Sequence, residues 1–185
     1  MLFMGQELIV TMRFEDKKTG ELMHEFLIAY WRKSWSMTDE VFKFIRDTPT
    51  KEVFSEDSQS YKLNALFIYD FKKFLLDQLA DKNSDAFSNS FWGSFVCYQQ
   101  TVRQLGNINA WLEFFSNRYE VLDEIENAAA NGEQPCFDGC FDPDAIGYML
   151  SEYDGEILKD KEKELVYVLY HLDNYRMVIE VENSY

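Results

Sequence analysis

The chain has 185 residues, of which 17% are aromatic and only three are proline, and its net charge is −15. This length fits one domain, and so many aromatic residues supply a buried core, which excludes a disordered or linker-rich chain. The negative charge disfavours nucleic acid and anionic membranes as direct partners, because like charges repel.

The first 47 residues are expected to form a β-hairpin followed by a helix. Over residues 6–14, apolar side chains occupy every second position, as in a strand with one buried face. These side chains are Leu8, Val10, Met12 and Phe14. A polar turn that ends in Gly20 leads into a second strand over 21–31. The helix is expected to begin at Ser36, where the sequence SMTD matches a capping box.

The middle of the chain is predicted to be a polar connector over 48–60 followed by a helical section over 61–155. Apolar residues recur there at spacings of three and four, which predicts three long helices. They span 61–81, 88–105 and 109–129. Gly106 is expected to end the second helix, and the Asn-Gly pair at 131–132 the third.

A shorter helix is expected after Asp142, which is placed as the N-cap with Pro143 as the first helical residue. Gly155 is expected to end it. The tail, 156–185, is predicted to be an acidic hairpin with Asp173–Asn174 as its turn. Residues 158–172 also fit helical spacing, and their Val and Tyr content favours a strand without closing the alternative.

Two terminal hairpins around a helical middle predict an α+β fold in a single domain. We expect the hairpins to join in one antiparallel sheet that packs against four or five helices. No apolar run is long enough to span a membrane, and the N-terminus lacks a signal-peptide pattern, which favours a cytoplasmic location. The three cysteines give no disulfide framework, in agreement with that location.

The sequence contains no catalytic signature. Its glycines form no phosphate-binding loop, and no GxSxG elbow is present. Cys136 and Cys140 form a single C-x3-C pair that only His24 or His171 could complete, so ordinary thiols are favoured over a metal site. A histidine paired with Cys97 or Cys136 is a weaker alternative. We therefore predict no cofactor, no metal and no enzymatic activity.

The acidic residues are concentrated in the last third of the chain. Residues 119–185 hold 17 acidic and 4 basic side chains, and no Lys, Arg or His occurs from Glu120 to Glu156. An ordinary solvated surface mixes signs, so we expect this region to bind a basic partner. The candidate partner-binding residues are Glu120, Asp123, Glu124, Glu126, Asp138, Asp142, Asp144, Glu152, Asp154 and Glu156.

These features favour an acidic protein that inhibits a basic, nucleic-acid-handling protein, such as a nuclease, a restriction enzyme or an RNA-guided effector. Carboxylates spaced along a helix would imitate phosphates, as small phage or mobile-element inhibitors do in general character. An immunity protein that neutralises a basic toxin would use the same electrostatics. A general interaction module with an incidental acidic flank, or a small enzyme with an unrecognised site, stays open as an alternative.

Overall fold

The computed structural model of the chain describes residues 7–32, 35–47, 53–56, 60–81, 84–87, 91–133, 150 and 153–184. The chain divides into two compact units. We call Met1–Leu105 together with Arg176–Tyr185 the sheet unit, and Gly106–Tyr175 the helical unit. The single domain predicted from the length of the chain stays a prediction.

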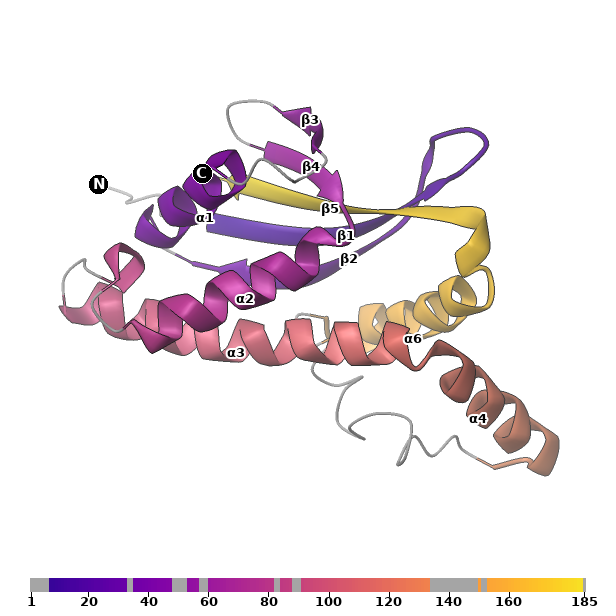
Figure 1. The fold of residues 1–185 in the computed structure, drawn as a ribbon. Helices are drawn as coiled ribbons and strands as arrows, with labels where there is room; N and C mark the ends of the chain where they lie inside the picture. Colours follow the sequence, from indigo (N-terminus) through magenta and orange to yellow (C-terminus); the bar gives the residue numbers. More distant parts are fainter. Residues whose placement is uncertain are drawn as a thin grey trace. The chain divides into compact units, whose positions relative to one another are not determined.

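The sheet unit is built on a five-stranded antiparallel sheet with strand order β2-β1-β5-β4-β3 (Figure 1). The strands are β1 (Glu7–Asp16), β2 (Leu22–Trp31), β3 (Val53–Glu56), β4 (Ser60–Asn64) and β5 (Tyr175–Ser184). The first and last strands are neighbours, since Arg13 of β1 contacts Glu180 and Glu15 contacts Arg176. The predicted α+β class, with strands from both termini in one antiparallel sheet, is confirmed.

The N-terminal hairpin forms as predicted. Its first strand buries one face, made of Leu8, Val10, Met12 and Phe14. At the turn, the side-chain oxygen Oδ1 of Asp16 accepts hydrogen bonds from the backbone amides of Lys18 (2.7 Å) and Thr19 (2.9 Å). These two bonds, with Thr19 contributing more, hold the pKa of Asp16 below its ordinary value. Gly20 closes the turn with φ +74°, a conformation that favours glycine.

The predicted connector over 48–60 is wrong for the part that the structure describes, because β3 lies within it. The helix predicted from residue 61 is also wrong at its start, where β4 precedes a helix that begins at Phe67. Tyr61 and Leu63 alternate with half-exposed neighbours and are buried, and β4 pairs along β5. The side chain of Asn64 then accepts a hydrogen bond from the amide of Leu66 (2.9 Å), which turns the chain into the helix.

The long helical segments are α1 (Trp35–Asp47), α2 (Phe67–Ala80), α3 (Phe91–Ser116), α4 (Arg118–Asn131) and α6 (Gly155–Tyr170), with short 3-10 helices η1 (Asp85–Phe87) and η2 (Leu172–Asn174). The first of them begins one residue before the predicted start at Ser36. None of the helices in these described segments has both the length and the apolar character that crossing a membrane requires.

Aromatic side chains fill the core of the sheet unit. Phe42 of α1 meets Tyr61 of β4 edge to face, with 5.3 Å between ring centroids. Phe71 of α2 meets Trp31 of β2 in the same way at 5.9 Å. Burial of such large rings between the helices and the sheet accounts for the high aromatic content of the sequence.

The helix predicted over 88–105 continues through Gly106 into the first part of the helix predicted over 109–129, and the two form α3, so the predicted stop at Gly106 is wrong. A glycine inside a helix destabilises it by about 1 kcal/mol but does not end it unless the backbone turns away. Here the backbone leaves the helix at Asn117 instead, where φ is −102° and ψ is 28°. The stop predicted at 131–132 is confirmed, because Gly132 adopts φ +66° at the end of α4.

The tail contains one strand and not a hairpin. Residues 155–170 form α6, so the preference for a strand over 158–172 is wrong and the helical alternative is correct. Leu165, Val168 and Leu169 are buried at helical spacing, and this burial outweighs the local Val and Tyr content. Gly155 begins this helix, with φ +53°, so the prediction that it ends a helix is wrong. The helix predicted after Asp142, and the Cys136–Cys140 pair, lie outside the described residues.

A candidate acidic interface on the helical unit

The negative charge of the chain is concentrated in one of its two units. Residues 106–175 contain 16 acidic and 4 basic side chains, a net charge of −12. The remaining residues, which make up the sheet unit, contain 17 acidic and 14 basic side chains, a net charge of −3. Most of the excess negative charge therefore belongs to the helical unit.

Helix α4 presents part of this charge on a well-terminated scaffold. Val121 and Ala128 are its buried residues. At its end, the amide of Glu133 donates to the carbonyl of Ala128 (2.9 Å), and the amide of Gly132 donates to that of Ala129 (3.3 Å). This is a Schellman arrangement, which satisfies carbonyls that would otherwise lack donors. The helix therefore holds its outward-facing side chains in a fixed register.

Three carboxylates, Glu120, Asp123 and Glu126, are exposed on α4. Residues three apart on a helix have Cβ atoms about 5–6 Å from each other. Glu124, between the last two, is only half-exposed and makes a contact of its own. Among the described residues, no Lys, Arg or His forms an ion pair with any of these three exposed carboxylates. They therefore form a row of negative charges available to a partner.

The cations of the helical unit are mostly paired with other carboxylates. Arg118, at the start of α4, lies 3.1 Å from Asp173. On α6, Lys159 lies 3.2 Å from Glu156, and Lys161 lies 3.1 Å from Glu164. Glu156, one of the candidate partner-binding residues, is therefore already paired with a cation of its own helix. Among the described residues, exposed carboxylates without a paired cation therefore lie on α4, and also on α6 at Asp160 and Glu162.

The ten predicted interface residues fall into three groups. Glu120, Asp123, Glu124 and Glu126 share α4. Asp154 and Glu156 lie at the start of α6, with Asp154 in the N-cap position. The other four, Asp138, Asp142, Asp144 and Glu152, lie outside the described residues. The charge of Glu126 acts on Tyr170, at the other end of α6 and about 20 Å along the axis from Glu156. The two described groups are therefore separate.

The sequence prediction missed a set of aromatic residues on the last turn of α6. Tyr167, Tyr170 and His171 stand at spacings of three and four, so they share one side of a helix. In the strand that was predicted, Tyr170 would have pointed away from the other two. Burial, and secondly the charge of Glu126 on α4, raises the pKa of Tyr170. The pattern Y-x-x-Y-H in the sequence could have revealed these residues, but it places all three rings on one side only if the segment is a helix.

Two of the residues considered for catalysis, Cys97 and His24, have ordinary structural surroundings. Cys97 is buried, and burial raises the pKa of its thiol to about 11, which leaves little thiolate at neutral pH. His24 lies on β2 opposite Phe14 of β1. Within the described ranges, no group of three or more His, Cys, Asp or Glu side chains is arranged to hold a metal ion.

Comparison with known proteins identifies no relative. No protein-family model matches the chain, and no curated protein or solved structure matches it. The candidate interface is therefore defined by the exposure, spacing and charge of its own side chains.

Proposed function

We propose that this chain is a non-enzymatic acidic binding protein that inhibits a basic, nucleic-acid-handling protein by occupying its nucleic-acid site. The observation that carries this proposal is the row of exposed carboxylates on α4, Glu120, Asp123 and Glu126, which has no paired cation among the described residues. The unit that contains the row has a net charge of −12, so the surrounding field has the same sign.

The mechanism is occlusion of a basic cleft. Proteins hold nucleic acid largely through Lys and Arg contacts to phosphate oxygens. Carboxylates accept hydrogen bonds from the same donors, and such charge-assisted bonds are stronger than neutral ones. The three carboxylates follow one another about 4.5 Å apart along the helix axis, a regular series of negative charges that is somewhat wider than the 3.4 Å between phosphates of one DNA strand. A nuclease, a restriction enzyme or an RNA-guided effector presents a cleft of this kind.

The proposal is tested by affinity capture from lysate at low salt, followed by displacement with duplex DNA. The recovered protein should be rich in Lys and Arg and should handle nucleic acid. Because exposed charges are screened by salt, its recovery should fall as salt is raised. Duplex DNA should release the captured partner, since DNA and this chain compete for the same site on that partner.

The triple variant Glu120→Lys, Asp123→Lys, Glu126→Lys should weaken capture by about tenfold or more. Its matched control is Asp39→Lys, Asp47→Lys, Asp77→Lys, which reverses three exposed carboxylates on helices of the sheet unit and changes the net charge equally. If the two triple variants behave alike, if the partner is acidic, or if DNA does not displace it, the proposal is wrong.

A further inference from the structure

Helix α4 carries an exposed tyrosine within its row of carboxylates. The side chain of Tyr119 is 73% exposed, and no other large apolar side chain among the described residues is more exposed. Because successive residues of a helix are rotated by about 100°, Asp123 and Glu126 lie within about 40° of Tyr119 around the helix axis. Both carboxylates are exposed. We call Tyr119, Asp123 and Glu126 the Tyr119 face.

The Tyr119 face points away from the packed side of the helix. Val121 and Ala128, the buried residues of α4, lie about 160–180° from Tyr119 around the axis. The four Lys and Arg side chains of the helical unit all belong to described segments, and none of them forms an ion pair with Asp123 or Glu126. The face is therefore open to a partner, and its charge is complementary to a basic one.

Asp123 is placed to share one ligand with the Tyr119 ring. Side chains of a helix lean toward its N-terminus, so the carboxylate of Asp123 is expected to lean over the preceding turn, where Tyr119 lies. Residues four apart on a helix have Cβ atoms about 5–6 Å from each other. One planar cation can therefore contact the ring and the carboxylate together.

One side of the Tyr119 ring already holds a guanidinium group. The guanidinium carbon of Arg118 lies over this ring, 5.5 Å from its centroid, while its Nη1 lies 3.1 Å from Asp173. The Arg118 side chain is only 15% exposed, so the 73% exposure of Tyr119 means that the rest of the ring is open. Asp173 compensates the charge of Arg118, which lowers its repulsion of a second cation. The contact also restricts the ring, so less entropy is lost when a ligand binds.

The helical unit holds a second cation of its own by the same combination of groups. The ammonium of Lys161 lies 5.4 Å from the ring centroid of Tyr153 and 3.1 Å from Glu164. In both places a tyrosine ring and a carboxylate hold one cation between them. The Tyr119 face offers this combination to a cation from outside the chain.

We propose that the Tyr119 face binds an arginine side chain of the basic partner, with the guanidinium stacked on the open side of the Tyr119 ring and hydrogen-bonded to Asp123. Arginine fits better than lysine because its planar guanidinium stacks on aromatic rings and bonds a carboxylate through two parallel N–H groups. The identity of the partner rests on the proposed function, whereas the preference for arginine rests on the face alone.

The test uses the full chain and two defined probes, hexa-arginine and hexa-lysine peptides, titrated at low salt and followed by NMR chemical shifts. The peptides carry equal charge, so net charge alone does not distinguish them. We expect hexa-arginine to bind about 2- to 5-fold more tightly, the range of one exposed cation–π contact. Tyr119→Leu and Asp123→Asn should each abolish this preference, and the double variant should lose no more than either one. Tyr119→Phe, which keeps the ring, should retain it.

A matched control is Tyr69→Leu with Asp77→Asn on α2, where Tyr69 is 54% exposed; this variant should keep the preference for arginine. Equal affinity for both peptides, or a preference that survives Tyr119→Leu or Asp123→Asn, overturns the inference. In that case capture of a basic partner that Glu120→Lys with Glu126→Lys weakens leaves the proposed function standing. If the preference holds but DNA releases no basic partner, only the proposed function fails.

Discussion

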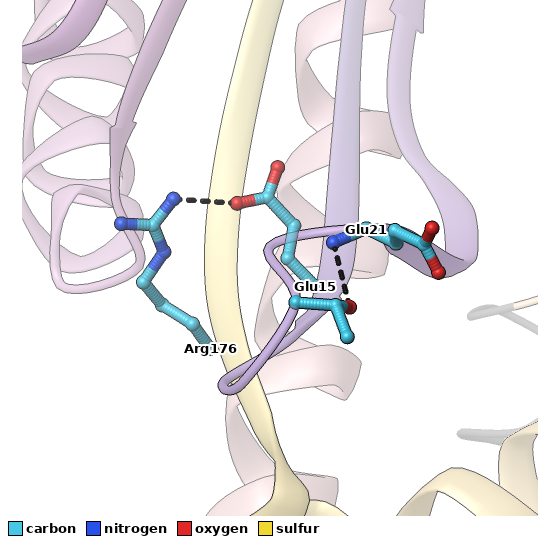
Figure 2. A network of polar contacts seen from close by, with 4 residues as sticks. Glu15, Glu21 and Arg176 are labelled. Atoms are coloured by element: carbon cyan, nitrogen blue, oxygen red, sulfur yellow. Dashed lines mark hydrogen bonds and ion pairs between the residues drawn. The ribbon is translucent and has the colours of Figure 1, made fainter.

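Arg176 of β5 donates a hydrogen bond through Nη2 to Oε1 of Glu15 on β1, at 2.6 Å, across 161 residues of sequence (Figure 2). The Glu15 side chain is only 9% exposed, whereas that of Arg176 is 53% exposed. The pair joins the first strand of the chain to the last at the centre of the strand order. A nearly buried carboxylate therefore depends on a partner that reaches it from the surface.

Replacing Arg176 should destabilise the sheet unit. In Arg176→Ala the buried carboxylate of Glu15 loses its cation and the hydrogen bond, and losing a charged hydrogen bond costs about 1.5–3 kcal/mol. Because Arg176 is half-exposed, water recovers part of this, so we expect a decrease of about 1–2 kcal/mol in the free energy of unfolding. Denaturant titration of the purified protein measures it.

The control is Lys159→Ala, which removes the same charge from the pair with Glu156, where both side chains are exposed. That pair should contribute less than about 0.5 kcal/mol. A loss of equal size in the two variants would show that net charge, and not the buried pair, determines the effect.

Local sequence patterns predicted the elements whose buried face can be recognised from their own residues. The alternation from Leu8 to Phe14 identified β1, and Gly132 identified the end of α4. Strand β4 was missed because its five residues are too few to show a period before the helical pattern begins. What makes it a strand is pairing with β5, more than a hundred residues away, which no local window contains.

The candidate site was predictable to the same extent. Its carboxylates on α4 follow from charge counts and helical spacing alone. Arg118 pairs with Asp173, which lies 55 residues away in the sequence. The local sequence therefore could not show which carboxylates are neutralised by a cation. The aromatic residues on the last turn of α6 were missed because residues 158–172 were assigned to a strand on Val and Tyr content, which tertiary burial overrides.

A second prediction concerns a buried chain of hydrogen bonds in the sheet unit. The indole N–H of Trp31 donates to Oγ1 of Thr101 (3.0 Å), whose hydroxyl donates to the backbone carbonyl of Cys97 (2.7 Å). In Thr101→Val the shape is kept, but the fully buried indole N–H loses its acceptor. The free energy of unfolding should fall by about 1–3 kcal/mol, measured by denaturant titration.

Ser116→Ala is the matched control for this hydroxyl. Its Oγ donates to the carbonyl of Leu112, also four residues earlier and at 2.7 Å, but at an exposed position that water can satisfy. The change should stay within about 0.5 kcal/mol. If Thr101→Val were equally mild, the indole would have found another acceptor, and the chain of hydrogen bonds would carry no net stability.

Gly106 inside α3 and Gly132 at the end of α4 should respond in opposite directions to the same substitution. An added Cβ meets nothing within 4 Å at either Gly106 or Gly132, so only backbone conformation distinguishes them. Gly132→Ala places a side chain at φ +66° and should destabilise by about 1 kcal/mol. Gly106→Ala lies inside α3 and should stabilise by about 0.5–1 kcal/mol. Thermal unfolding followed by circular dichroism tests both, and a loss of stability in Gly106→Ala contradicts this account.

The last prediction concerns the reactivity of Cys97, tested in a Cys136→Ser, Cys140→Ser background so that only one thiol is present. Burial raises the pKa of Cys97 from 9.0 to about 11, and the side-chain hydrogen bond with Thr101 opposes this. The thiolate is the reactive form and burial also restricts the access of a reagent, so near pH 8 labelling should be at least about a hundredfold slower in the folded than in the denatured protein. Between about pH 8 and pH 10 the folded rate should rise about a hundredfold, whereas an ordinary thiol gains only about tenfold. A folded rate that levels off near pH 9 would mean that the thiol ionises as it does in water.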